Sequence, residues 1–129
     1  MNYFTRPNTK PGYLEIFKSR PFEIRQDESS KILHKYSDRV PIIIDTVNAT
    51  FELDKYKYLV PRDLTVAQFL YVIRKRCKLA PEKGLFLFVN NTLLSSGVLI
   101  SQVYRNQADN DGFLYIIVSE ESVFGGLYN

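Results

Sequence analysis

The sequence predicts a single α+β domain, and three observations indicate it. The chain has 129 residues, 45% of them hydrophobic and 24% charged, which is enough to close one core and too little to require a second. Short β-branched apolar runs alternate with segments whose apolar residues recur at helical spacing. Pro and Gly separate these segments. We therefore expect a small sheet covered by helices.

Two helical segments are expected before the first strand. Residues 1–20 form an N-terminal arm in which Tyr13, Leu14, Ile16 and Phe17 lie close enough for a short helical turn or a docking segment. Pro21 suits the first turn of a second helix. Its apolar residues can share one helical face, and the helix is expected to end near Ser37; these residues are Phe22, Ile32, Leu33 and Tyr36.

Two strands are expected next, joined by a long loop. Val40–Ile44 is a short β-branched run and Tyr56–Val60 is another, with the mainly polar stretch 45–54 between them. Pro61 has no amide hydrogen and should therefore end the second strand.

The clearest helix begins after Thr65. Thr65 and Gln68 match a capping box, in which each side chain accepts a hydrogen bond from the other residue's backbone amide. The helix carries an apolar stripe, and its basic last turn complements the helix dipole. The stripe consists of Val66, Phe69, Leu70, Val72 and Ile73, and the basic residues are Arg74, Lys75, Arg76 and Lys78.

Three elements complete the domain. Leu85–Val89 fits a strand buried on both faces, a short helix is expected over Val98–Tyr104, and Phe113–Val118 is the final strand. If the first and last strands lie side by side in the middle of the sheet, this is the β-grasp arrangement of ubiquitin, preceded by two additional N-terminal helices. Sequence order alone also admits other α+β sandwiches. Residues 21–118 then form the domain, and residues 119–129 form a flexible tail.

Composition limits the classes of function. A formal charge of +3 permits attraction to acidic partners without choosing among them. The single cysteine, Cys77, cannot form an intramolecular disulfide and fits a reducing compartment. No window approaches the roughly 20 apolar residues that a bilayer crossing needs, and the first residues lack the apolar core of a secretory signal. The unmodified chain is therefore expected to be cytosolic.

No catalytic, metal or cofactor site is expected. No recognisable motif pairs Cys77 with His34, the only histidine, so a non-catalytic thiol and a solvated helix histidine are expected. The sequence shows neither metal-ligand spacing nor a glycine-rich phosphate loop. The basic run 74–78 could bind phosphates, but a charged helix end is usually a solvated face. We therefore expect no nucleic-acid partner, and a basic RNA-binding module remains the third reading.

Several segments together resemble one known family. They are Lys57–Arg76, Pro21-Phe22-Glu23 with Arg25, Arg39-Val40-Pro41, Pro81-Glu82-Lys83, Phe88-Val89-Asn90 and Asp111-Gly112-Phe113-Leu114-Tyr115. They resemble the autophagy ubiquitin-like modifiers, the family of the GABA-receptor-associated protein and of microtubule-associated protein light chain three. The resemblance runs in register from Pro21 to Gly125 and implies a β-grasp core preceded by two helices.

The resemblance also implies a cycle of covalent modification. A tail-processing cysteine protease would cut between Gly125 and Gly126, and cleavage after Gly126 is the alternative. An E1-like and then an E2-like enzyme would activate the new carboxylate and join it to phosphatidylethanolamine. The protein would thereby move from the cytoplasm to the autophagosome membrane. Glycine suits the reacting position because the absence of a side chain leaves its carbonyl open to attack from either face.

A peptide-docking surface is the second implication. An edge strand over 57–60 could pair with an extended ligand segment, while flanking pockets take its side chains. The family's ligands are cargo receptors and adaptors with an aromatic residue and, three positions on, an aliphatic one. By resemblance the aromatic pocket comprises Glu28, Ile32, Pro41, Lys57, Leu59 and Phe113, and the aliphatic pocket comprises Tyr58, Val60, Pro61, Leu64, Phe69 and Val72. Lys57 and Arg76 would contact acidic residues beside the motif.

Two simpler interpretations remain open at this stage. Ile32, Phe69, Val72 and Phe113 could be ordinary core residues, since an apolar helical stripe normally faces a core. The whole chain could also be a ubiquitin-like interaction domain that is never conjugated. In both main readings the protein is not an enzyme.

Overall fold

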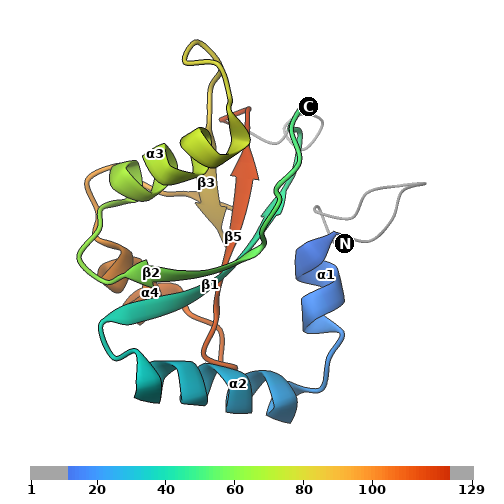
Figure 1. Ribbon diagram of the computed structural model, residues 1–129, viewed down its shortest axis with the longest axis vertical. Helices are drawn as coiled ribbons and strands as arrows, with labels where there is room; N and C mark the ends of the chain where they lie inside the picture. Colours follow the sequence, from blue (N-terminus) through green and yellow to red (C-terminus); the bar gives the residue numbers. More distant parts are fainter. Residues whose placement is uncertain (1–11, 123–129) are drawn as a thin grey trace.

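The computed structural model describes residues 12–122, and Figure 1 shows a sheet flanked by helices on both sides. Within that range the elements are α1 (Tyr13–Lys18), α2 (Phe22–Lys35), β1 (Arg39–Thr46), β2 (Lys57–Pro61), α3 (Val66–Cys77), β3 (Phe86–Val89), β4 (Thr92–Leu93), α4 (Ile100–Gln107) and β5 (Leu114–Ser119). All the expected helices and strands are present, with ends that differ by a few residues from the predicted ones.

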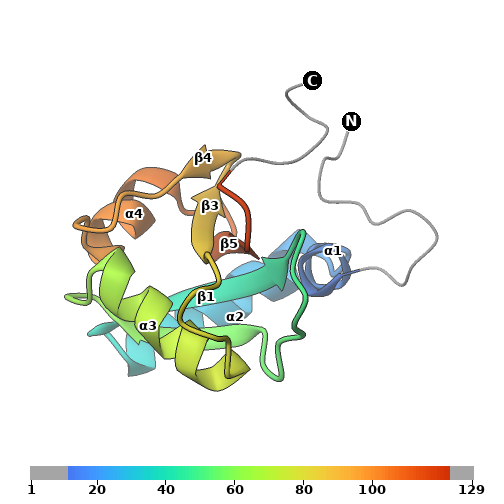
Figure 2. The same ribbon diagram turned by 90° about the horizontal axis from the view of Figure 1, so that it is seen from above.

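The sheet has the β-grasp topology, which confirms the predicted fold class. Its strand order is β2-β1-β5-β3-β4, so the first and last long strands are neighbours in the centre. β1 and β5 run parallel, with Ile42 opposite Leu114 and Ile44 opposite Ile116. The other strand pairs are antiparallel. Figure 2 shows α3 and α4 on one side of the sheet and α1 on the other.

The strand β4 was not predicted, although the sequence carries its signal. Asn90 and Asn91 have φ angles of 50° and 65°, which is the left-handed region that two-residue hairpin turns require and that Asn tolerates. The turn brings Thr92 opposite Val89 and adds a two-residue edge strand.

The larger core lies between the sheet and α3 with α4. Val40, Ile42 and Ile44 alternate along β1 and face this core, and Phe69 and Ile73 come from the buried stripe of α3. The predicted capping box is confirmed, since Thr65 Oγ1 accepts from the Gln68 amide at 3.1 Å and Gln68 Oε1 accepts from the Thr65 amide at 2.9 Å. Fixing the first turn of α3 in this way holds its apolar face against the sheet.

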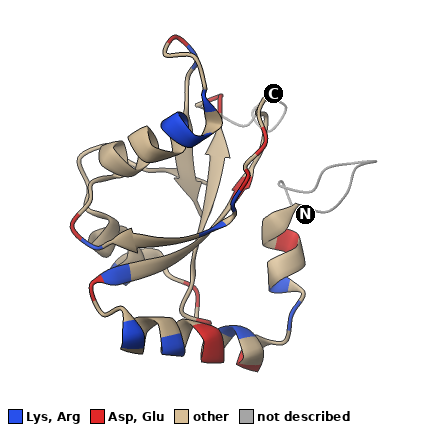
Figure 3. Cartoon of the chain, in the orientation of Figure 1, with Lys and Arg blue, Asp and Glu red and all other residues tan. Residues whose placement is uncertain are grey.

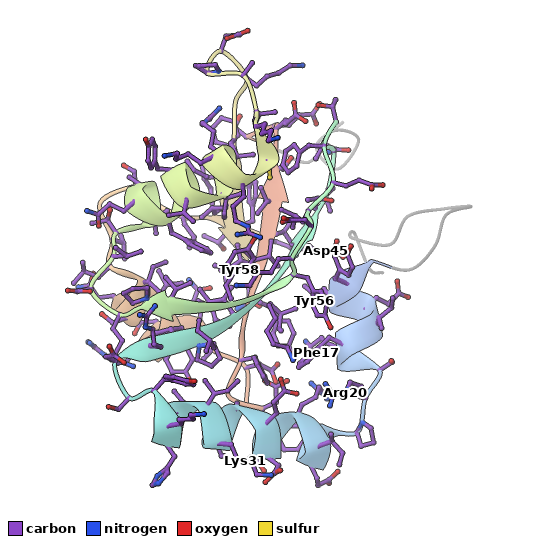
Figure 4. The ribbon with its side chains drawn as sticks, in the orientation of Figure 1. Phe17, Arg20, Lys31, Asp45, Tyr56 and Tyr58 are labelled. Atoms are coloured by element: carbon purple, nitrogen blue, oxygen red, sulfur yellow. The ribbon has the colours of Figure 1, made fainter. Side chains whose placement is uncertain are left out.

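The smaller core lies on the opposite face, under α1. Phe17 is 2% exposed and packs with Ile43 and Phe113. Its ring meets the Phe113 ring edge-to-face, with centroids 4.9 Å apart. Beside it Tyr13 stacks on Tyr56 at 4.8 Å. Figure 4 shows Phe17 and Tyr56 between α1 and the sheet. The segment predicted as a helical turn or a docking segment is therefore a short helix that packs on the sheet through Phe17.

The helix α2 buries less than its pattern predicts. Ile32 and Leu33 are half-buried, but Phe22 and Tyr36 are more than one-third exposed, and the only buried residue of α2 is Ser29. Figure 3 shows charged residues distributed along this helix. An apolar stripe therefore does not explain how α2 is held.

Polar contacts to the residues before β5 hold α2 instead. The Arg25 guanidinium is 2.6 Å from a carboxylate oxygen of the fully buried Asp111, and Ser29 Oγ donates to the Asp111 carbonyl at 2.5 Å. Tyr115 donates its hydroxyl to the same carboxylate. Gly112 has φ +90°, and a Cβ there would lie 2.8 Å from Ser29 Cβ. Glycine is therefore needed for α2 to approach this closely.

The body extends slightly beyond the predicted domain boundary at Val118. Ser119 is fully buried in β5, and Glu120 is hydrogen-bonded to the loop between β1 and β2. The expected processing residues Gly125 and Gly126 lie outside the described residues, as do residues 1–11 of the N-terminal arm. Among the helices described, none combines the length and the apolarity needed to cross a membrane.

Candidate functional site

The strand β2 is an edge strand of the sheet, as a docking surface for an extended peptide requires. Within residues 12–122 it pairs only with β1, from Arg39 opposite Pro61 to Ile43 opposite Lys57. Successive β2 residues alternate between half-buried and buried, so the strand presents different side chains to its two sides. Figure 1 shows β2 between α2 on one side and α3 on the other.

On the α2 side, Lys57 and Glu28 form an ion pair. The Lys57 ammonium contacts one Glu28 oxygen, and Arg20 Nη1 lies 3.1 Å from the other. The Lys57 ammonium also lies 5.2 Å from the centre of the Phe17 ring, within the range of a cation–π interaction. Glu28 thereby connects α2 both to β2 and to the segment between α1 and α2.

The electrostatics of Glu28 favour its ionised form. Burial by itself would raise the pKa of this carboxyl, but hydrogen bonds and charges from Lys57, and then from Arg20, outweigh burial and lower the pKa below its ordinary value. The carboxylate is therefore a stable partner for both cations near neutral pH. An acidic ligand that binds Lys57 must compete with it.

The remaining aromatic-pocket residues divide into surface and core. Ile32 and Leu59 are half-buried, whereas Pro41 is buried and Phe113 is 0% exposed. Pro41 is the register partner of Leu59. Ile32 packs against the cluster of Phe17, Ile43 and Phe113. Phe113 is thus a core residue beneath this surface, as the simpler interpretation allowed.

The aliphatic-pocket residues on the α3 side divide in the same way. Tyr58, Val60 and Phe69 are buried, and the Tyr58 and Phe69 rings meet edge-to-face at 5.9 Å. Leu64 is half-buried against the same core, while Val72 is 41% exposed. The simpler interpretation therefore holds for Phe69 and not for Val72.

Pro61 lies apart from the group to which the resemblance assigned it. It is half-buried, and strand alternation places it on the same face as Lys57 and Leu59 rather than with Tyr58 and Val60.

Arg76 also has a partner within the chain. Its guanidinium is 3.0 Å from Asp54, which contributes first among the causes that raise the Arg76 pKa. It lies 5.9 Å from the centre of the Tyr58 ring, and Lys55 approaches the same ring at 4.9 Å. Within the described residues the buried Tyr58 hydroxyl has no hydrogen-bond partner, and burial raises its pKa.

Three neighbouring residues were not predicted as part of this surface. Phe17 lies beneath Lys57, Arg20 contacts Glu28, and Asp54 contacts Arg76. The apolar spacing around Phe17 was visible in the sequence, but its place under β2 depends on how α1 folds back. The two ion pairs join residues 8 and 22 positions apart and leave no local pattern.

The other candidate residues do not form a reactive group. Cys77 ends α3, and burial is the main cause that raises the pKa of its thiol, which disfavours the nucleophilic thiolate. His34 is exposed near the end of α2. Among residues 12–122, no group of His, Cys, Asp or Glu could hold a metal ion. In the basic run, Arg74 donates to the carbonyls of Ala80 and Lys83.

Comparison with known proteins establishes the family. The model of the family described as "Autophagy protein Atg8 ubiquitin like" matches residues 24–125. The chain belongs to this family. It is therefore an autophagy ubiquitin-like protein, as the resemblance implied.

Individual Atg8 relatives agree in sequence and in structure. Autophagy-related protein 8A of Oryza sativa subsp. indica is 54% identical over 107 residues, covering 81% of this chain and 90% of the relative. The crystal structure of Trypanosoma brucei ATG8 has a TM-score of 0.78 and 43% identity, covering 86% of this chain and 97% of the other. Plasmodium falciparum Atg8, solved with a P. falciparum Atg3 peptide, has a TM-score of 0.74 and 31% identity, covering 83% and 96%.

Proposed function

We propose that this Atg8-family chain is a modifier that is cut after Gly125 and joined through the freed glycine carboxylate to phosphatidylethanolamine. The observation that carries the proposal is the family match, which continues through residue 125 and stops there. That end point supports Gly125 over Gly126 as the mature terminus. The protein is cytoplasmic before conjugation and lies on the autophagosome membrane afterwards.

In this cycle the chain is a substrate and a docking platform, not a catalyst. The protease, the E1-like enzyme and the E2-like enzyme perform the chemistry on its tail. The raised pKa of Cys77 supports this role, because the only thiol of the chain favours its unreactive form. The P. falciparum relative, solved with an Atg3 peptide, supports docking of the E2-like enzyme through a peptide segment.

The β2 edge is the proposed site for ligand peptides. An extended segment adds to β2 through backbone hydrogen bonds, its aromatic side chain binds near Lys57 and Leu59, and its aliphatic side chain binds near Leu64 and Val72. Acidic flanking residues replace Glu28 on Lys57 or Asp54 on Arg76. Cargo receptors and adaptors with the aromatic-x-x-aliphatic motif are the expected partners.

Processing is tested by the intact mass of the full chain after incubation with the cognate tail-processing protease. Loss of residues 126–129 is expected, and a Gly125→Ala variant should resist cleavage. Loss of residues 127–129 alone would assign Gly126 instead. An uncut wild-type chain would favour the unconjugated interaction domain.

Conjugation is tested with the processed chain, the two conjugation enzymes, ATP and liposomes that contain phosphatidylethanolamine. The expected product floats with the liposomes and has the mass of the protein plus one lipid minus water. A chain that ends at Gly125 but remains unmodified in this mixture would contradict the proposal. Liposomes of phosphatidylcholine alone provide the control, since they lack the amine that forms the new bond.

Docking is tested by the affinity of a fluorescent peptide that carries the motif with acidic flanks. Val72→Ala should weaken binding about tenfold, because truncating valine removes roughly two methyl groups of apolar contact. Tyr71→Ala is the matched control, since Tyr71 is 61% exposed on the same helix and is not among the expected contacts. Equal losses for both variants would argue against docking at β2.

A further inference from the structure

The residue Glu120 fixes the point from which the tail leaves the body. It follows directly after β5, and its side chain is only 11% exposed. One carboxylate oxygen accepts hydrogen bonds from both the backbone amide and the hydroxyl of Thr50, the latter at 2.7 Å. The Glu120 amide donates to the Asn48 carbonyl at 3.3 Å. Side chain and backbone of Glu120 therefore both bind the loop between β1 and β2.

A second loop confines Glu120 from the other side. Lys83 Nζ lies 3.9 Å from the second carboxylate oxygen. A Cβ built on Gly84 would lie 3.1 Å from the Glu120 carbonyl oxygen, closer than ordinary van der Waals contact. Figure 1 shows the β1–β2 loop and the end of β5 at the same end of the sheet. We name these contacts of Glu120 with Asn48, Thr50 and Lys83 the Glu120 clasp.

The clasp ends abruptly at the next residue. Glu121 is exposed; its backbone amide donates to Ser119 Oγ at 3.0 Å, but within residues 12–122 its carboxylate makes no hydrogen bond or ion pair. The hydrogen bonds from Thr50, first that of its backbone amide and then that of its hydroxyl, lower the pKa of Glu120, so the clasp contains a carboxylate near neutral pH. The Glu120 side chain is therefore held by Thr50 and Lys83, whereas the side chain of the adjacent Glu121 is not held by the described residues.

We propose that Glu120 is a positioning residue for the reactions at the tail glycine. It fixes the base of the tail on the body surface, so that a protease that recognises the body receives the tail at a defined place and direction. This inference rests on the proposed processing at Gly125. Gly125 is five positions beyond Glu120, so the glycine can lie at most about 18 Å from the clasp.

Loss of the clasp should increase the number of backbone residues that must be ordered when the tail enters an active site. Removing the Glu120 side chain removes its contacts with Thr50 and Lys83 and leaves only the long backbone hydrogen bond to the Asn48 carbonyl, at 3.3 Å. Ser119, which pairs with Phe86 in the sheet, is then the last firmly fixed residue. One more backbone residue would then have to be ordered each time the tail enters an active site, which corresponds to about a five- to thirtyfold smaller population of inserted tails. Docking of the body is unchanged, so the defect should appear in kcat and not in KM.

The test is steady-state cleavage of the full chain by the cognate tail-processing protease, with the product measured by intact mass. For Glu120→Ala we expect kcat to fall about five- to thirtyfold with KM within twofold of wild type. Thr50→Val removes only the hydroxyl contact and should fall by a smaller factor. Thr50→Ser keeps both contacts and should restore wild-type kcat. Glu121→Ala, the matched control, should also behave as wild type.

The outcomes separate this inference from the proposed function. A wild-type chain that is not cut contradicts the proposed function itself. If wild type is cut and Glu120→Ala retains kcat within twofold, the positioning role is wrong. An equal loss for Glu121→Ala would assign the effect to charge alone. If Glu120→Ala does not fold, Thr50→Val and its serine counterpart decide the question, with peptide affinity at β2 reporting an intact body.

Discussion

Replacing Phe17 by alanine tests how the N-terminal helix is held on the body. Phe17 is the only buried residue of α1, and its ring packs on Phe113 and Ile43. A buried Phe→Ala change costs about 3–5 kcal/mol. Because α1 is short and can shift into the space left by the ring, we expect a value near the lower end, about 3 kcal/mol. The surface near Lys57, which lies over the same ring, should loosen as well.

Urea unfolding followed by circular dichroism measures the effect. For a chain of this size, with a slope of about 1.5 kcal/mol per molar urea, a loss of about 3 kcal/mol lowers the unfolding midpoint by about 2 M. Ile16→Ala is the matched control, because its neighbouring side chain is 53% exposed and should shift the midpoint by less than about 0.3 M. If both variants have the same midpoint, α1 is not held by Phe17 and the second core is assigned wrongly.

Three further predictions concern the polar contacts that hold α2, the Lys57–Glu28 ion pair at β2 and the buried hydroxyl of Tyr58. Gly112→Ala should destabilise the protein by at least about 2 kcal/mol, since its backbone has φ +90° and a Cβ would meet Ser29; Gly97→Ala, with open space around it, should differ little from wild type in thermal unfolding. The lowered pKa of folded Glu28 means that its contribution is complete above its ordinary value of 4.5 and is lost as the pH falls through the folded value. Glu28→Gln should therefore show a shallower loss of stability than wild type below pH 4.5 in urea titrations, and parallel curves would contradict this. Tyr58→Phe removes a buried hydroxyl without a partner and should raise stability by about 1 kcal/mol, so a clear loss in urea unfolding would show that the hydroxyl is satisfied in solution.

The regular elements were predictable because local patterns determine them. The capping box at Thr65 begins α3 where the sequence places it, and the β-branched run 40–44 lies within β1. Pro61 ends β2 as expected. The order of elements alone left the central pairing of the first and last strands open; the resemblance implied it, and the topology confirms it.

What failed depends on contacts between distant residues. The apolar spacing of α2 suggested a buried face, but a polar clamp holds this helix, formed by Arg25 and Asp111, which are 86 positions apart. Two ion pairs at the predicted docking surface were also not foreseen. Lys57 pairs with Glu28, and Arg76 pairs with Asp54. Neither arrangement leaves a periodic trace in the sequence, since each depends on how separate elements meet.

The parallel pairing of β1 with β5 has a consequence for how the protein is made. During synthesis the N-terminal half emerges first, yet β1 cannot complete its inner edge until β5 has been translated. A nascent chain that stops before Leu114 therefore exposes an apolar strand edge of the kind that promotes aggregation. Because this contact is so distant along the chain, folding should be slower than in helical domains of equal length. Once the ribosome has added β5, the sheet can close, and the proposed cut after Gly125 lies beyond every strand of the described sheet.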